Sequence, residues 1–569
     1  MINYKKLTAA MAAGIIAIFT ITGCAMPWQK AADDSSSNVS TVSAGNLSQS
    51  GENALSLEFD SEDLDSSYNE SECTKINLSG SGATVSGSGV TVENGNITIT
   101  SAGSYIISGT LTDGSIKVNC SEKGTVRLIL NGASISSSST APVVVEEAKK
   151  VLVTLADGTT NTITDKTRQS VDDEDFSSAV YSKADLVFNG SGTLNVNAGY
   201  RNGIKSTDDL KVVSGTFNIT SNEDGIIGKD LLGIKDGKFT IKSGSDGMKS
   251  TYDTDTSKGN IVITGGEFDI TASNDGVHCN EDILISGGNL TISSGDDGVH
   301  ADDNLQVDGG TIDIMKCCEG LEGVQITLND GDISIVASDD GINAADGSSS
   351  SGMGIGGFGG GQTSSSDSSI LLTINGGNIF VNASGDGLDS NGNIVMNGGN
   401  VTVLGPTSDG DTALDFDGAF TINGGVLMAF GSSGMLETPT SAQNGCCIVT
   451  TLGTVSANSA FSLTDSSGNV IMSYIPTKNY ASAIVYSSDI KSGSTYTVTA
   501  GSTTQSITVN SNVTTNGVSG GFGGGQNGGF GGGQRGGQPG GSNQQGGMPG
   551  GNSGNGRSNS ASSSTVNQV

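Results

Sequence analysis

The feature that most restricts the fold is a repeat of about 22 residues in the middle of the chain. Aligned on Asp-Gly and related pairs, its glycines are Gly203, Gly225, Gly247, Gly276, Gly298, Gly320, Gly341 and Gly387. Most steps are 21 or 22 residues, one is 29, and the last is lengthened by a Gly/Ser-rich segment after Asp346. A unit this short cannot bury its own apolar face, so the repeats must stack on one another.

A second motif runs in phase with the first and predicts strands. Gly-Gly pairs lie between short apolar runs, as in "ISGGNLTIS", where Ile283, Ile285, Leu290 and Ile292 alternate with polar residues. Such alternation is typical of strands, and Gly-Gly of a turn. Leucine-rich repeats and calcium nonapeptide repeats have consensus sequences that this chain lacks. The sequence therefore predicts an all-β parallel β-helix whose rungs of about 22 residues stack roughly 4.8 Å apart.

Stacking turns equivalent positions into columns along the axis. The acid before each glycine gives a first column: Asp224, Asp246, Asp275, Asp297, Glu319, Asp340 and Asp386. The second residue after each glycine gives another: Lys205, Ile227, Lys249, His278, His300, Glu322, Asn343 and Asp389. The chain's only two histidines, His278 and His300, should therefore lie directly above one another.

The acidic column predicts bound Ca²⁺. Carboxylates one strand spacing apart repel one another and raise one another's pKa, and Ca²⁺ accepts six to eight oxygen ligands in flexible geometry. The expected metal ligands are Asp224, Asp246, Asp275, Asp297, Glu319 and Asp340, with Asp302 and Asp303 close by. The alternative is that each Asp-Gly is only a corner, with the Asp bonded to local backbone and the Gly at positive φ. Asn375, Asn397 and Asn423 predict an internal amide ladder rather than a site.

The net charge of the chain restricts the classes of partner that it can bind. The chain has 59 acidic and 26 basic residues, a formal net charge of −33. This disfavours nucleic acid and anionic membrane surfaces, because no cationic stripe is available to neutralise phosphates. An anionic partner would need cations as a bridge.

The ends of the chain differ from the repeat in composition. Residues 1–23 resemble a lipoprotein signal peptide, ending in Ile21-Thr22-Gly23 before Cys24, the expected site of lipidation. This predicts an extracytoplasmic protein held at the membrane by a lipid anchor alone, on a flexible tether at 24–72. The remaining organisation is predicted as follows: a β-helix at 73–439 with a β-rich N-terminal cap and a disordered Gly/Ser insertion at 347–369, a C-terminal β cap or small β-sandwich at 440–515, and a disordered Gly/Gln-rich tail at 516–569. Without a CxxC pair a zinc site is not expected, and Cys73–Cys120 is a disulfide candidate.

Several motifs in order resemble one family. They include "ITSAGSYIISGTLTDGSIKV", "VRLILNGASISSSSTAPVVV" and "DGVHCNEDILISGGNLTI", within roughly residues 75–430. They are similar to bacterial carbohydrate-binding domain proteins, formerly of unknown function, with a member that binds cellulose and polygalacturonate. The resemblance implies a right-handed parallel β-helix with bound calcium, similar in shape to pectate lyases but regarded as binding rather than cleaving.

Three functions remain open on these grounds. The first is a monomeric binder of acidic polysaccharide, with Lys249, His278, His300 and Tyr252 as ligand-binding residues. The only tryptophan, Trp28, lies in the tether, so the folded part has no tryptophan ring to stack on flat cellulose. The second is a calcium-dependent uronate lyase, in which Lys249, Lys205 or Arg201 removes the proton beside the sugar carboxylate. The third is a surface spacer or adhesin without catalysis.

Overall fold

The computed structural model describes residues 40–42, 55–168, 176–252, 254–346 and 369–518. All of them lie in one compact unit, Met1–Gly523. The expected signal peptide, Cys24, almost all of the 347–369 insertion and most of the tail lie outside these residues. Among the described residues, no helix has the length and apolar character needed to cross a membrane.

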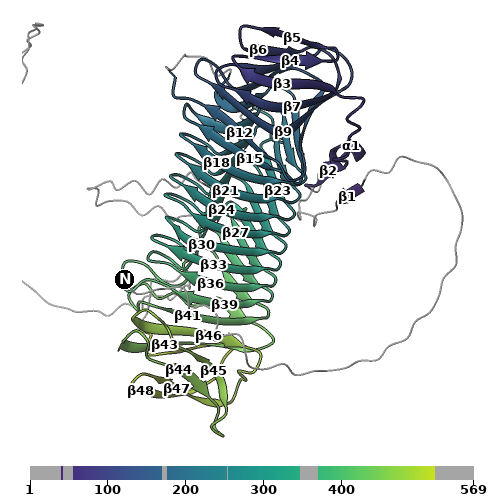
Figure 1. Ribbon diagram of the computed structural model, residues 1–569. Coiled ribbons are helices and arrows are strands. Elements are labelled where there is room, and N and C mark those ends of the chain that lie inside the picture. The colour runs from purple at the N-terminus through teal and green to yellow at the C-terminus, as the bar shows by residue number, and fades with distance from the viewer. Residues whose placement is uncertain (1–39, 43–54, 169–175, 253, 347–368, 519–569) are drawn as a thin grey trace, which may run out of the picture. The chain divides into compact units, whose positions relative to one another are not determined.

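The repeats form three strands each, and every strand pairs in parallel with its equivalent in the next repeat (Figure 1). In one repeat these are β25 (Val277–Cys279), β26 (Ile283–Ile285) and β27 (Asn289–Ser293). The register places Val277 opposite Val299 and Ile283 opposite Leu305. The all-β class is confirmed, and the pairing is that of a parallel β-helix. Its right-handed sense and a single rung length stay predictions.

The equivalent strands of successive repeats form three long sheets. Sheet 1 contains β5 (Val90–Glu93), β6 (Asn96–Ile99), β8 (Ser115–Asn119), β10 (Val143–Glu147), β13 (Ser178–Ser182), β16 (Asn202–Ser206), β19 (Ile226–Gly228), β22 (Met248–Ser250), β25, β28 (Val299–Ala301), β31 (Leu321–Gly323), β34 (Ile342–Ala344) and β37 (Leu388–Ser390). Sheet 2 contains β11 (Lys150–Leu155), β14 (Asp185–Gly190), β17 (Asp209–Val212), β20 (Leu231–Ile234), β23 (Asn260–Ile263), β26, β29 (Asn304–Val307), β32 (Gln325–Leu328), β35 (Leu371–Ile374), β38 (Asn393–Met396), β40 (Phe420–Ile422) and β42 (Ser441–Ala442). Sheet 3 contains β12 (Thr160–Asp165), β15 (Thr193–Ala198), β18 (Thr216–Ser221), β21 (Lys238–Ser243), β24 (Glu267–Ala272), β27, β30 (Thr311–Cys317), β33 (Asp332–Ala337), β36 (Asn378–Asn382), β39 (Asn400–Leu404) and β41 (Val426–Gly431).

The core is one continuous cluster of inward side chains shared by the three sheets. Its aromatic members stack from rung to rung, with ring centroids 5.0 Å apart for Phe217 and Phe239 and 4.8 Å apart for Phe239 and Phe268. Because every rung presents its apolar residues at the same positions, each one buries the face that its neighbour exposes.

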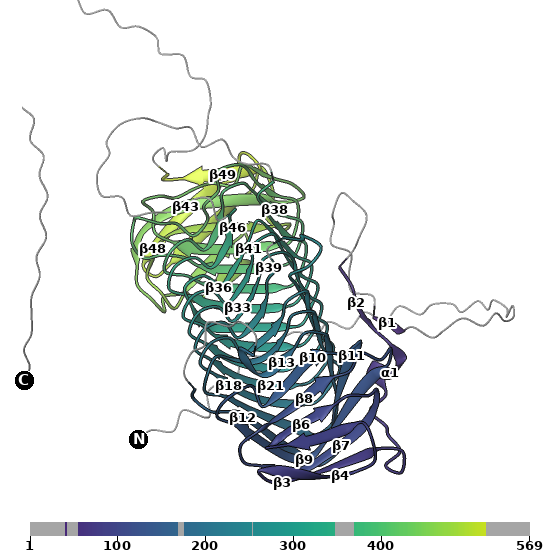
Figure 2. The same ribbon diagram turned by 90° about the horizontal axis from the view of Figure 1, so that it is seen from above.

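Antiparallel strands close both ends of the stack (Figure 2). At the first end, β3 (Thr74–Gly80) pairs with β4 (Gly82–Ser86) and with β7 (Gly103–Leu111), which pairs in turn with the long β9 (Thr125–Ser137). At the other end, β46 (Tyr480–Ser487) pairs antiparallel with β41 and with β43 (Cys446–Val455), which also pairs with β49 (Val513–Asn516). A four-stranded antiparallel sheet follows, made of β45 (Val470–Tyr474), β44 (Phe461–Thr464), β47 (Thr495–Ala500) and β48 (Thr503–Thr508).

The prediction of a flexible tether over 24–72 is wrong for its last part. Strand β2 (Leu57–Phe59) and helix α1 (Ser61–Leu64) pack on the outside of sheet 2, and β1 (Ser40–Val42) pairs with β2. Leu57 is 0% and Phe59 2% exposed. Lys150 of β11 is also buried and lies 2.7 Å from a carboxylate oxygen of Asp63. Two apolar residues in strand alternation and one buried ion pair therefore hold this segment, here called the strap (residues 55–64), on the stack.

The disulfide candidate Cys73–Cys120 is not formed, since both cysteines are free. Cys120 belongs to the inner core, whereas Cys73 packs against a separate outer cluster with Ile106 and Ile129. The two thiols therefore lie on opposite sides of the wall formed by the strands.

Candidate functional site

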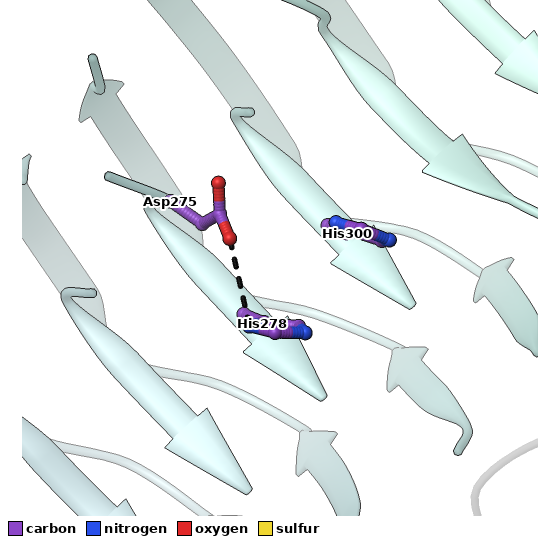
Figure 3. A group of neighbouring side chains, drawn as sticks. All are labelled: Asp275, His278 and His300. Carbon is purple, nitrogen blue, oxygen red and sulfur yellow. Dashed lines mark ion pairs between the residues drawn. The ribbon is translucent and has the colours of Figure 1, made fainter. Parts of the chain in front are cut away.

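A column of outward-facing side chains runs along sheet 1. Consecutive register partners are Tyr181, Lys205, Ile227, Lys249, His278, His300, Glu322, Asn343 and Asp389. This set, here called the outward column, begins with basic residues, passes through two imidazoles and ends with acids. The rings of His278 and His300 stack with centroids 5.0 Å apart and an angle of 19° between planes, which confirms that the histidines lie one above the other (Figure 3).

The acidic column beside it has a structural role. Oδ1 of each Asp accepts a hydrogen bond from the backbone N–H of the equivalent residue in the next rung: Asp224 from Asp246, Asp246 from Asp275, Asp275 from Asp297, and Asp340 from Asp386. These bonds differ from the corner interpretation of Asp-Gly, in which the Asp bonds local backbone, because each donor lies one rung away. The corner interpretation also expected a positive φ at the glycine, which is wrong for Gly276 and others like it. Glycine is required at position 276 because the neighbouring rung is so close that an added Cβ would lie 2.6 Å from the carbonyl oxygen of Gly298.

Near its middle, the acidic column is neutralised by the protein's own cations. Lys249 Nζ lies 2.5 Å from Oδ2 of Asp246, which is fully buried. Burial alone would favour the neutral carboxyl, but the nearby His278 imidazole, together with hydrogen bonds from Lys249 and Asn274, holds the pKa of Asp246 well below its usual range. Burial opposes the charged form of Lys249 as well, yet the bond to Asp246 and nearby carboxylates raise its pKa. Asp246 therefore has less need of a metal ion than the sequence suggested.

Both imidazoles are surrounded by carboxylates. Nε2 of each lies 3.4 Å from Oδ1 of Asp302. His278 Nδ1 lies 3.5 Å from Asp275 Oδ2, the contact drawn in Figure 3, and His300 Nδ1 lies 3.3 Å from Asp297 Oδ2. Burial opposes protonation, but the neighbouring carboxylates raise the pKa of His278 to about 9. In the metal-free protein these groups form a network of opposite charges.

The end of the outward column at Asp389 is different, because its acids have no such partner. Burial, together with repulsion between neighbouring carboxylates, raises the pKa of Asp340 and Asp386 to about 7 and that of Asp389 to about 8. None of these three forms an ion pair with a Lys, Arg or His among the described residues.

Asn343 adds an oxygen to this acidic end. Its side chain is 9% exposed, Nδ2 donates to Glu319 over 2.8 Å, and the buried Oδ1 has no hydrogen-bond partner. A buried amide oxygen without a donor, beside carboxylates without a cation, is a donor set made entirely of oxygen. This chemistry suits Ca²⁺ better than any nitrogen-preferring ion.

The expected metal ligands therefore do not form a single site. Asp275 and Asp297 lie with the imidazoles, Glu319 and Asp340 belong to the acidic end, and Asp302 sits beside the imidazoles' Nε2 atoms. Of the eight expected ligands, only Asp275 and Asp297 belong to a group of three close metal-ligating side chains among the described residues; Asp224, Asp246, Asp302, Asp303, Glu319 and Asp340 do not. One such group that the repeat analysis missed is Asp185, Asp208 and Asp209, where Lys211 lies 3.0 Å from Asp209.

A groove of about 740 Å³ lies over the basic end of the outward column. Its lining includes five basic side chains: Lys183, Arg201, Lys205, Lys229 and Lys249. Ser177, Asn202, Thr207 and Thr251 add hydroxyl and amide groups, and two acids, Glu223 and Asp224, leave the basic residues in excess. We call this the cationic groove. Lys183 and Lys229 were not predicted, although each follows a member of the outward column by two residues, as Asp302 follows His300.

Tyr252 lies beside the cationic groove but does not present a free ring. The ammonium groups of Lys229 and Lys258 lie 5.0 and 4.7 Å from its ring centroid. These cation–π contacts hold the two lysines beside the ring, and contact of Tyr252 with a ligand stays a prediction.

The pairing of the strands defines this protein as a parallel β-helix. Its outward column changes from basic to acidic residues along the stack. Residues 93–352 match the family of carbohydrate-binding domain-containing proteins, which confirms the resemblance drawn from the motifs.

Two known proteins are similar to parts of the chain. A carbohydrate-binding domain-containing protein of Acetivibrio thermocellus is 35% identical over 123 residues, which are 21% of this chain and 43% of that protein. The chain thus matches less than half the length of this relative. A solved structure, described as a gadolinium derivative of the polysaccharide lyase-like protein from C. thermocellum, is 30% identical, with 41% of this chain and 96% of that chain covered and a TM-score of 0.40.

Proposed function

We propose that this protein binds an acidic polysaccharide along the outward column, with the sugar carboxylates meeting the cationic groove. The observation that carries the proposal is the gathering of five basic side chains around one groove on a chain of net charge −33. The match to a family described as carbohydrate-binding supports the ligand class.

The chemistry of the groove suits a uronate polymer such as polygalacturonate. Arg and Lys form charge-assisted hydrogen bonds with carboxylates, and the neighbouring hydroxyl and amide groups can bond sugar hydroxyls. Arg201 is 3.6 Å from Glu223 and Lys249 is bonded to Asp246, so both are held in place rather than freely mobile. Flat, neutral cellulose is a poorer fit, because stacking on it requires exposed aromatic rings and the one aromatic residue that lines the groove, Tyr181, is only 3% exposed.

Calcium forms a second part of the proposal. The residues that would hold it are those of the acidic end: Glu319, Asp340, Asn343, Asp386 and Asp389. Bound Ca²⁺ would offset the repulsion between these carboxylates and offer open coordination positions to carboxylates of the polymer. The bound ion would thus reduce the negative charge of the acidic end and link it to the carboxylates of the polymer.

A lyase is less well supported than a binder. A general base must be neutral before it can remove a proton, whereas the bond to Asp246 keeps Lys249 protonated at neutral pH. A purely structural spacer has no use for a groove lined by basic side chains. Lipid attachment at Cys24, an extracytoplasmic location and a monomeric state are also proposed, on the sequence motifs alone.

Retention on immobilised polysaccharides tests the proposal. We expect retention on polygalacturonate at low salt, loss of most of it at high salt, and little retention on cellulose at either. A chelator should weaken binding to polygalacturonate without abolishing it, since the cationic groove does not depend on a metal. Equal retention on neutral and acidic polymers, or none on either, would contradict the proposal.

A further inference from the structure

Two overlapping groups of metal-ligating side chains surround the stacked histidines. One comprises Asp275, His278 and His300, and the other Asp297, His300 and Glu322; within each group, the ligand atoms all lie within 4.8 Å of one another. His300 belongs to both. We infer that His300, with Asp297 and Glu322 and assisted by Asp275 and His278, binds a divalent transition-metal ion of the Zn²⁺ type, separate from any Ca²⁺ at the acidic end.

The distances favour a metal site over a set of hydrogen bonds. His300 Nδ1 lies 3.3 Å from Asp297 Oδ2 and 3.4 Å from Glu322 Oε2. A charge-assisted N–H···O bond is normally about 2.7–2.9 Å long. Ligands about 2.0–2.1 Å from a tetrahedral ion lie roughly 3.3–3.4 Å from one another, so the distances from His300 Nδ1 to the two carboxylate oxygens match two edges of such a site.

The next rung supplies a second, independent observation. The Nδ1 atom of His278 is buried and has no hydrogen-bond partner in the described part of the chain. A buried imidazole nitrogen without a partner is costly, and coordination or a contact with a bound ion would satisfy it.

The surroundings match those of metal-binding histidines. Asp302 Oδ1 lies 3.4 Å from Nε2 of both rings, on the side away from the Nδ1 atoms. A carboxylate behind a ligating imidazole fixes its orientation and raises its basicity. Imidazole nitrogen is favoured by Zn²⁺ and similar ions, whereas Ca²⁺ takes oxygen ligands. The group around His300 is also one rung farther from the positive charge of Lys249 than His278 is.

Cobalt provides the test, because Co²⁺ in a four- or five-coordinate site has strong visible absorption bands. The full chain, without a metal-binding tag and freed of metal with a chelator, is titrated with Co²⁺. We expect a single equivalent to bind with such bands, Zn²⁺ to displace it, and an excess of Ca²⁺ to leave it in place. The variant His300→Gln should weaken Co²⁺ binding by about tenfold or more, and Lys238→Gln, at an exposed position on sheet 3, should not.

Three results would overturn the inference: no Co²⁺ uptake below about 1 mM, equal uptake by His300→Gln, or thiolate charge-transfer bands that place the ion on cysteines. Glu322→Gln, which removes a ligand while keeping its shape, serves as a second variant if His300→Gln does not fold. Polysaccharide binding through the cationic groove does not depend on this outcome.

Discussion

The backbone N–H of Asp297 donates a hydrogen bond to Oδ1 of Asp275 across one step of the stack, over 2.9 Å. The same bond recurs between other members of the acidic column. These carboxylates are therefore first of all a ladder that holds neighbouring rungs in register, and only their second oxygen is free to meet a cation.

The ladder predicts different effects for two substitutions of Asp275. Asp275→Ala leaves a buried N–H without an acceptor and should cost roughly 1–3 kcal/mol of unfolding free energy. Asp275→Asn keeps an acceptor oxygen and should cost less. Urea denaturation compares both with Asp296→Ala, which changes an exposed acid on the same corner. Equal losses for the Ala and Asn variants would contradict the ladder.

The acidic end predicts that stability without calcium falls as pH rises. The pKa values of Asp340, Asp386 and Asp389 are raised from 3.8 to about 7, 7 and 8, so between these limits the folded state holds more protons than the unfolded state. The free energy of unfolding must then decrease with pH over this range. Thermal denaturation in chelator should give a lower Tm at pH 8 than at pH 5.5, and Ca²⁺ should raise Tm more at pH 8. A Tm unaffected by calcium at both pH values would contradict calcium binding at the acidic end.

The protonated state of Lys249 predicts that the protein does not cleave its ligand. Incubation with polygalacturonate and Ca²⁺ should release no unsaturated uronate, measured by its ultraviolet absorbance. Turnover that is present in the wild type and lost in Lys249→Ala would show instead that this lysine acts as a base.

The strap predicts a stability contribution from a residue far from the proposed site. Lys150→Met leaves buried Asp63 without its cation and should cost about 3–5 kcal/mol. Exposed Lys149→Met should cost almost nothing. Hydrogen exchange at Leu57 and Phe59 reports whether the strap has detached. Unchanged protection in Lys150→Met would mean that apolar contacts alone hold it.

Much of the fold was predictable from periodicity. A fixed repeat forces equivalent residues into columns, which is why the stacked histidines were foreseen. The amide ladder is confirmed too: Asn397 donates to Asn375 over 2.7 Å and Asn423 to Asn397 over 2.8 Å. In both cases a single spacing fixed which residues meet.

Other features could not be predicted because they depend on contacts outside the repeat. The strap is too short to show a repeat, and its partner Lys150 is 87 residues from Asp63. Spacing also gave no indication which acids have cations of their own, since the bond from Lys249 to Asp246 depends on side-chain direction. The order of residues in the acidic column was thus predictable, but which of its carboxylates are balanced by the protein's own cations was not; bound calcium stays a prediction.

Charge reversal in the cationic groove tests the account most directly. Lys205 and Lys249 are both changed to Glu, and retention on polygalacturonate is compared with that of Lys238→Glu, an exposed lysine on sheet 3 that is paired with Glu267. The account predicts that apparent affinity falls about tenfold or more in the double variant, the equivalent of at least one charge-assisted contact, and stays unchanged in the control. Undiminished binding by a folded double variant would contradict it.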